Sequence, residues 1–137
     1  MMKCLILTEY FPPDPGGEPE YIYNFSKCIS GDVTVQTYKY KYRAGISLGS
    51  EYKYLEKLHI KRVKYFRFFP TLSHFIKLID ALILQRRWHF DIIICNSVFS
   101  GYLGLFLKKL FGINYILIAH GWEVAVRCGV GSKFNRA

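Results

Sequence analysis

Three short apolar runs constrain the fold most, because none of them alternates with polar residues. They are KCLIL at residues 3–7, DIIIC at 91–95 and YILIA at 115–119. A strand that is apolar on both faces must be covered on both faces, which is typical of a parallel sheet. These runs therefore predict strands inside such a sheet.

Helical spacings of three and four residues lie between the apolar runs. One helix is predicted through Ile22, Phe25 and Ile29, with Gly31 as its expected stop. Another is predicted through Leu103, Phe106, Leu107 and Leu110, followed by Gly112. A third helix, over residues 71–87, has a stripe that we expect to face the core: Leu72, Phe75, Ile76, Ile79, Leu82 and Ile83.

Two further strands complete the pattern: DVTVQTY directly after Gly31, and RVKYFRF at residues 62–68. Strands and helices then alternate along the chain, with a basic connector between the second and third strands. This order predicts an α/β fold, a Rossmann-like doubly wound parallel sheet with right-handed crossovers. Residues 1–137 are the size of one domain.

Several classes of protein are not indicated. FIKLIDALIL, the longest apolar stretch, is interrupted by Lys77 and Asp80, so no membrane-spanning helix is expected. The beginning, MMKCLILTEYFPP, is too short in apolar residues for a signal peptide, which makes a cytoplasmic location the expectation. The four cysteines show no C-x-x-C spacing, so neither a disulfide framework nor a zinc site is predicted.

Positive charge is concentrated in residues 38–67, which carry nine Lys or Arg and two Asp or Glu. The basic residues that bracket the 71–87 stripe, mixed with aromatic residues, are Arg62, Lys64, Arg67, Arg86 and Arg87. Such a mixture suits an anionic membrane, here the inner face of the plasma membrane, and we rank that partner above nucleic acid because no nucleic-acid-binding motif accompanies it. A solvated surface is the simpler alternative.

Ligands of open parallel sheets bind at the carboxyl ends of the strands, near the point where the strand order reverses. Three segments are expected to meet there: Glu9–Gly17, the pair Asn96 and Ser97, and His120–Glu123. They define the candidate site.

Each segment also has a purely structural interpretation. Gly16 and Gly17 could admit a phosphate at a helix start or form a simple turn, and they lack the spacing of a dinucleotide fingerprint and the lysine of a P-loop. His120 could be a buried core histidine or a site residue. Asn96 and Ser97 could cap the next helix. Gly101 and Gly104 are expected to allow close packing of that helix on the sheet.

The quoted segments also resemble a known family. TEYFPPDPGG, YIYNFSKCIS, DIIICNSVFSGYLGLFLKK and FGINYILIAHGWEV occur in the order and spacing found in the N-terminal domain of glycosyltransferase family 4, the retaining transferases of GT-B fold. The resemblance implies the acceptor-side half of a two-domain hexosyltransferase that uses a nucleotide-sugar as co-substrate. The implied acceptor is a glycan, a lipid-linked molecule or a small molecule, and neither a cofactor nor a metal is expected.

The resemblance also implies roles for individual residues. His120 would line the catalytic cleft and Gly16 and Gly17 would lie against the donor diphosphate. The other implied donor- or acceptor-binding residues are Asn96, Ser97, Gly121 and Glu123. Glu18 and Pro19 depart from the family pattern, which has a hydrophobic and then a polar residue there.

The sequence ends at Ala137, before the family's paired glutamates and its donor-binding domain. We therefore expect a fragment, an N-terminal GT-B half incomplete at its C-terminus that does not catalyse transfer alone. A non-catalytic Rossmann-like module that binds anionic lipid or nucleic acid through residues 39–88 is the main alternative. An α/β domain with unrelated small-molecule chemistry is a further one.

Overall fold

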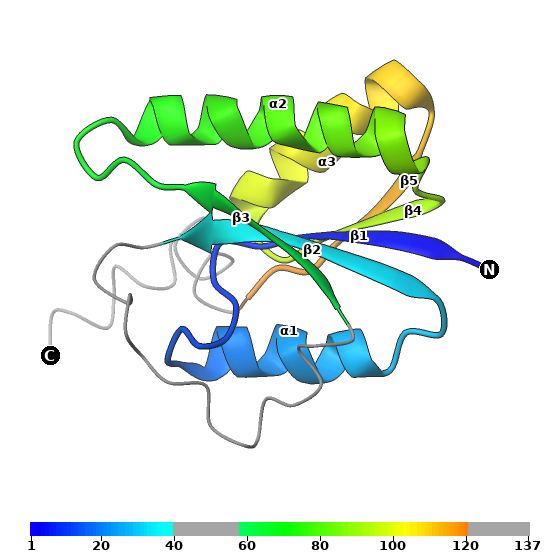
Figure 1. Cartoon of the computed structure of the whole chain (residues 1–137), viewed down its shortest axis with the longest axis horizontal. Helices are drawn as coiled ribbons and strands as arrows, with labels where there is room; N and C mark the ends of the chain where they lie inside the picture. The colour runs from blue at the N-terminus through cyan, green and yellow to red at the C-terminus, as the bar shows by residue number, and fades with distance from the viewer. Residues whose placement is uncertain (40–57, 121–137) are drawn as a thin grey trace, which may run out of the picture.

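The computed structural model describes residues 1–39 and 58–120 of the chain (Figure 1). Five strands form one sheet in the order β3-β2-β1-β4-β5, and all neighbouring pairs are parallel. The strands are β1 (Lys3–Leu7), β2 (Asp32–Lys39), β3 (His59–Lys64), β4 (Ile92–Cys95) and β5 (Asn114–Leu117). The predicted α/β class, Rossmann-like strand arrangement and order of elements are confirmed.

Helices cover both faces of the sheet. They are α1 (Gly17–Lys27), α2 (Pro70–Trp88) and α3 (Val98–Phe111). Figure 1 shows α1 on one face and α2 and α3 together on the other. One hydrophobic core, which includes Ile22 of α1 and Val35 of β2, lies beneath α1, and a second, which includes Ala81 of α2 and Leu107 of α3, lies beneath the other two helices. The doubly wound arrangement follows from this distribution of helices.

Helix α3 forms as its sequence predicts. The Ser97 hydroxyl caps its first turn by accepting from the Ser100 amide at 3.0 Å, and Gly112 ends it with φ 71°. A Cβ atom at Gly104 would lie 2.5 Å from Cys95 Sγ, and one at Gly101 would lie 3.0 Å from a Leu117 methyl group. The expected close packing of this helix on the sheet is therefore confirmed.

Two predicted element boundaries were wrong. Helix α1 ends at Lys27, and Gly31 instead occupies the turn into β2, with φ 146°. Strand β3 begins at His59 and ends at Lys64, so the segment 65–68 lies outside the strand. The last residue of β2, Lys39, pairs with Lys64, the last residue of β3, so the described ladder between these strands ends at that pair.

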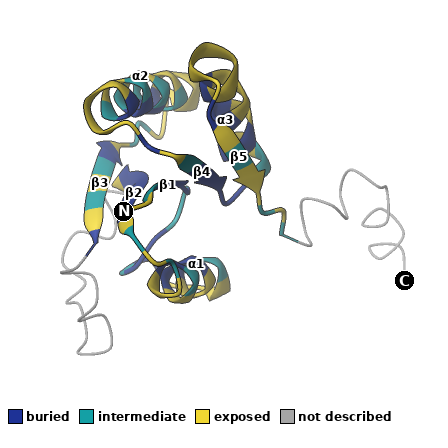
Figure 2. Cartoon of the chain, turned by 90° about the vertical axis from the view of Figure 1, so that its right-hand side faces the viewer, coloured by how far each residue is buried: buried dark blue, intermediate teal, exposed yellow. Residues whose placement is uncertain are grey.

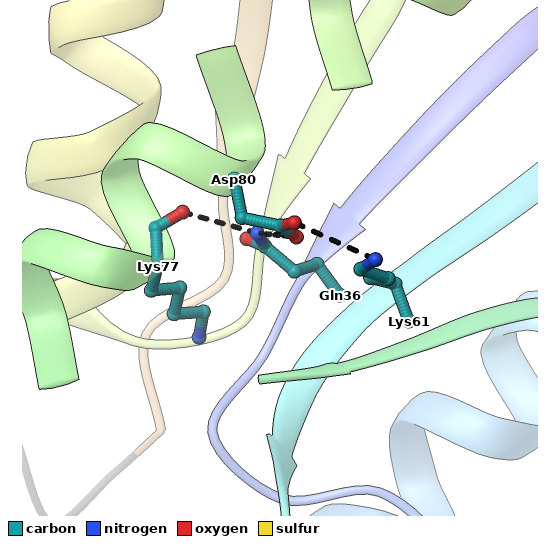
Figure 3. Close-up of polar contacts among 4 residues, drawn as sticks. All are labelled: Gln36, Lys61, Lys77 and Asp80. Atoms are coloured by element: carbon teal, nitrogen blue, oxygen red, sulfur yellow. Dashed lines mark hydrogen bonds and ion pairs between the residues drawn. The ribbon is translucent and has the colours of Figure 1, made fainter. Parts of the chain in front are cut away.

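The expectation that the apolar stripe of α2 faces the core was wrong for most of its residues, although Leu82 packs against the core. Leu72, Phe75, Ile79 and Ile83 are 42–59% exposed, whereas the buried residues of this helix are Ser73, Lys77, Ala81 and Gln85. The sheet beneath explains the inversion, because β2 presents the buried amide of Gln36 to the helix. Gln36 Nε2 donates to the Lys77 carbonyl at 3.0 Å and to the Asp80 carboxylate at 2.9 Å (Figure 3). These bonds pair the amide nitrogen of Gln36 with α2, whereas its Oε1 is buried without a hydrogen-bond partner in the described residues.

Within the described residues, no helix is long and apolar enough to cross a membrane. Cys4 and Cys95 are buried thiols in the two cores, as their apolar surroundings predict, and Cys28 is exposed. Burial raises the pKa of Cys4 to about 11 and that of Cys95 to about 12, so both stay protonated at neutral pH. Cys128 lies outside the described residues.

Candidate functional site at the strand-order reversal

The strand order reverses between β1 and β4. Strand β1 leads to α1 on one face of the sheet, and β4 leads to α3 on the opposite face. A crevice at the carboxyl ends of these two strands is the usual ligand site of a doubly wound sheet. Thr8 follows β1 and Asn96 follows β4, and both are fully buried. The backbone N–H of Asn96 donates to the Leu7 carbonyl at 2.9 Å, which holds the two strand ends side by side.

The Asn96 side chain joins three chain segments across this crevice. Its Nδ2 donates to Thr8 Oγ1 and to Glu18 Oε1, both at 3.2 Å, and its Oδ1 lies 3.1 Å from His120 Nε2. Asn96 and His120 belong to two of the segments predicted to converge at this edge, and Thr8 and Glu18 directly flank the third, Glu9–Gly17. Sequence reasoning assigned Asn96 a capping or ligand-binding role, whereas the cap of α3 is Ser97.

The bonds around Asn96 also assign the proton on His120. The Thr8 hydroxyl donates to the Tyr10 carbonyl at 2.9 Å, so toward Asn96 it must accept. The Glu18 carboxylate likewise accepts, so the Asn96 amide group turns its Nδ2 toward both and its Oδ1 toward His120. His120 Nε2 is then the donor, and in the neutral ring Nδ1 is the acceptor.

The glycine pair begins α1. Gly16 has φ 125°, a conformation that favours glycine, and caps the helix without a side-chain hydrogen bond. A Cβ atom on Gly17 would meet nothing within 4 Å, so the space in front of this residue is open. Glu18 and Glu20 occupy the first turn, where the helix dipole favours carboxylates. The carboxylate that departs from the family pattern thus holds Asn96 in place.

The proline-rich loop before the glycine pair is held by two contacts. Asp14 accepts a hydrogen bond from the Phe11 amide at 3.1 Å, while the guanidinium of Arg62 donates to the Pro12 carbonyl. Burial lowers the pKa of Arg62, and Asp14 opposes this effect. Arg62 therefore anchors the loop to β3.

Tyr21, in the second turn of α1, contacts His120 edge to face, with ring centroids 5.8 Å apart.

Lys77 is a site residue that sequence reasoning missed. Its side chain extends from α2 beneath the helix to the crevice, where Nζ donates to the Thr8 carbonyl at 2.7 Å and lies 4.5 Å from the centre of the Tyr38 ring. Burial lowers the pKa of Lys77 to about 8, and the carboxylates of Glu9 and Glu18 oppose the shift. The ammonium form therefore prevails at neutral pH and places a positive charge beneath the candidate site.

A cavity of about 1140 Å³ opens beside the crevice, at the carboxyl ends of β1, β2 and β3. Its lining combines aromatic rings with two cations and one carboxylate: Glu9, Tyr10, Tyr38, Lys64, Tyr65, Phe66, Arg67, Phe68, Phe69, His74 and Phe99. Sequence reasoning placed the aromatic residues 65–69 near a membrane surface and did not predict this cavity. Tyr38 lies on β2 and His74 on α2, so their contact depends on which side of α2 faces the sheet.

Two contacts hold His74 in the wall of the cavity. The His74 ring stacks on Phe99 with centroids 3.9 Å apart, and its Nδ1 lies 2.6 Å from the Tyr38 hydroxyl. Burial lowers the pKa of His74, and Lys77 lowers it further, so the ring is neutral at pH 7. Burial and the neighbouring Glu9 raise the pKa of Tyr38, so its hydroxyl keeps its proton at neutral pH.

The five basic residues that were expected to form one membrane-facing surface lie in three different places. Lys64 and Arg67 line the cavity, and Arg62 contacts the proline loop. Arg86 and Arg87 lie in the last turn of α2, near the opposite edge of the sheet, where Trp88 contacts His59 at the start of β3. Gly121 and Glu123, the remaining predicted site residues, lie outside the described residues.

In residues 1–39 and 58–120, no group of three or more His, Cys, Asp or Glu side chains is arranged to hold a metal ion. The fold and the crevice define a Rossmann-like α/β protein with a candidate site at the reversal of strand order. No family model matches the chain, and no curated protein matches it either.

Proposed function

We propose that this chain is the acceptor-side domain of a retaining glycosyltransferase. The enzyme would transfer a hexose from a nucleotide-sugar to a glycan, a lipid-linked molecule or a small molecule. The observation that carries the proposal is the hydrogen-bonded line from Glu18 through Asn96 to His120 across the strand-order reversal. It brings the histidine segment and the glycine-pair segment, on which the sequence resemblance rests, to one crevice.

The chemistry of this crevice suits a sugar. With Nε2 hydrogen-bonded to Asn96, the neutral form of His120 offers Nδ1 as an acceptor for a substrate hydroxyl, while Asn96 holds the ring in place. The open space in front of Gly17 lets a bulky group approach the backbone at the start of α1. Lys77 adds a fixed positive charge close to these groups, which favours an anionic ligand such as a sugar diphosphate.

The neighbouring cavity suits an acceptor. Its volume lies just above the usual range of small-molecule sites, which are mostly apolar with a few convergent polar groups. Here the aromatic walls would contact the apolar face of the acceptor, and Glu9 lies at the border with the crevice. In this proposal the donor site is completed by a second domain, as the resemblance to the GT-B family implies.

Histidine NMR tests the proposal, because the chain has four histidines that report on different places. His120 lies in the crevice and His74 in the cavity wall, whereas His59 and His89 lie near the opposite edge of the sheet. We expect an acceptor saccharide from a panel of free glycans, or a nucleotide-sugar, to shift the imidazole signals of His120 or His74. The signals of His59 and His89 serve as the internal control and should not move.

Two results would count against the proposal. One is a panel of saccharides and nucleotide-sugars that leaves all four histidine signals unchanged. The other is salt-sensitive binding to RNA that shifts His74 or His120, because that would favour the nucleic-acid alternative. We also expect no sugar transfer by the 137 residues alone, measured as release of nucleoside diphosphate.

A further inference from the structure

The outer face of α2 is apolar, although its inner face buries polar side chains such as Lys77 and Gln85 beside Ala81. Phe68 and Phe69 precede the helix and are 88% and 66% exposed. The exposed stripe continues along the helix through Leu72, Phe75, Ile79 and Ile83. The helix spans about 28 Å at the usual rise per residue, and the stripe runs along most of this length. Figure 2 shows the exposed sides of α2 and α3 turned away from the sheet.

Helix α3 extends this apolar face sideways. A groove of about 320 Å³ between the two helices is lined by Ile79, Leu82, Ile83, Arg86, Leu110 and Phe111. Leu110 and Phe111 are themselves 55% and 37% exposed. An apolar area of this extent on the surface of a folded domain indicates a binding surface.

The charged residues in the last turns of α2 and α3 are all positive. Arg67 precedes Phe68 at one end of the stripe and lines the cavity, and Arg86, Arg87, Lys108 and Lys109 lie in the last turns of the two helices at the other end. Neither helix has an acidic residue except Asp80. The Asp80 carboxylate turns toward the sheet, where it accepts from Gln36 and lies 3.7 Å from Lys61 (Figure 3).

We propose that the α2–α3 face docks on an anionic membrane, with α2 lying in the plane of the interface. An apolar stripe with cations at its ends is the pattern of a helix that inserts among acyl chains while its basic residues contact anionic headgroups. A second copy of the chain is a poorer occupant, because pairing α2 with α2 would bring the basic ends together without a carboxylate to offset them. This inference does not depend on the proposed transferase activity, since Asn96, Glu18 and His120 take no part in it. The two proposals share Arg67, Phe68 and Phe69, which also line the cavity.

Vesicle co-sedimentation of the full chain tests the surface. Phosphatidylcholine vesicles are compared with vesicles that also contain phosphatidylglycerol. We expect binding to the anionic vesicles that weakens with salt, and we expect Ile79→Glu/Ile83→Glu to reduce the partition coefficient by about tenfold or more. Both positions are exposed, so the variant should keep the circular-dichroism spectrum and melting temperature of the wild type.

Ile116→Glu is the matched control. Ile116 is 51% exposed, comparable with Ile79 and Ile83. Its neighbours Tyr115 and Leu117 contact the glycines of α3, so Ile116 points to the other face of the sheet. The control variant should therefore bind anionic vesicles like the wild type.

A second readout locates the contact on α2. The chain has two tryptophans, and Trp122→Phe leaves Trp88 as the reporter at the end of α2. We expect the Trp88 emission to shift to shorter wavelength on addition of anionic vesicles, since this side chain is 37% exposed in the protein alone.

The proposal is overturned if the wild type does not bind anionic vesicles, or if Ile79→Glu/Ile83→Glu binds as well as the wild type. It is also overturned if Ile116→Glu weakens binding equally. Self-association in sedimentation velocity that Ile79→Glu/Ile83→Glu abolishes, without vesicle binding, would identify a second copy as the occupant. His120→Ala should bind vesicles normally, which separates this inference from the proposed function.

Discussion

The ammonium group of Lys77 donates a hydrogen bond to the Thr8 carbonyl at 2.7 Å, from a helix on one face of the sheet to the end of the central strand. Lys77 is 1% exposed, and its Nζ also lies over the Tyr38 ring. This contact ties the orientation of α2 to the position of the loop that leads to the candidate site. It also makes the stability of the fold depend on pH.

The first prediction concerns that pH dependence. Below about pH 8 Lys77 is protonated in both the folded and the unfolded chain, and the folded state carries the full cost of burying the charge. Above its ordinary pKa of 10.5 the lysine is neutral in both states and this cost is absent. Between these values the unfolded chain binds more protons, so the contribution of Lys77 to stability rises with pH, by up to about 3 kcal/mol.

Urea unfolding of the wild type and of Lys77→Met at several pH values measures this effect. The free energy of unfolding of the wild type, minus that of the variant, should increase from pH 8 to pH 10. The subtraction removes groups that titrate alike in both proteins, such as Cys4, whose raised pKa destabilises the fold above pH 9. Parallel curves would show that Lys77 titrates alike in both states.

The second prediction concerns Asn96. Asn96→Ala removes the amide that joins Thr8, Glu18 and His120, and it leaves partly buried polar groups without their partner. We expect a loss of about 2–3 kcal/mol in the free energy of unfolding and a change in the His120 ring-nitrogen shifts, as the tautomer is released. Asn114→Ala, at an exposed position at the start of β5, is the control and should cost less than about 0.5 kcal/mol.

The third prediction separates two glycines. Gly104→Ala would place a methyl group 2.5 Å from Cys95 Sγ, so α3 must shift, and we expect a loss of about 1–3 kcal/mol in thermal or urea unfolding. Gly17→Ala meets open space and should leave the free energy of unfolding nearly unchanged. If the proposed function is correct, Gly17→Ala nevertheless weakens the ligand-induced shift of His120. Equal destabilisation by both variants would contradict the described packing.

The fourth prediction concerns thiol reactivity. In the native protein at neutral pH, a maleimide should label Cys28, which is exposed, and should leave Cys4 and Cys95 unlabelled. The two buried thiols are protected both by lack of access and by raised pKa values. Peptide mass spectrometry measures the labelling at each position, with urea-unfolded protein as the control in which all are modified. Rapid labelling of Cys95 in the native state would contradict its place beneath α3.

The candidate site could be predicted in part. The carboxyl ends of parallel strands share one edge, so the convergence of the glycine pair, Asn96 and His120 followed from the strand assignments alone. Which of them touch did not follow. Hydrogen bonds such as that of Asn96 Oδ1 with His120 Nε2 depend on rotamers and on the exact height of each loop above the sheet. The cavity was not predicted because its walls come from β2, α2 and α3 together.

The sequence by itself determined the five strands, the three helices and their alternation, because unbroken apolar runs and helical spacings are local signals. It also determined the cap at Ser97 and the close packing at Gly104. Only the tertiary structure decided which side of α2 faces inward. Helical periodicity identifies an apolar stripe, but the surface that a helix meets is made by other segments, and here Gln36 and the Thr8 carbonyl required polar partners. Lys77 supplies both partners, through its backbone carbonyl and its ammonium group, and most of the apolar stripe is therefore exposed.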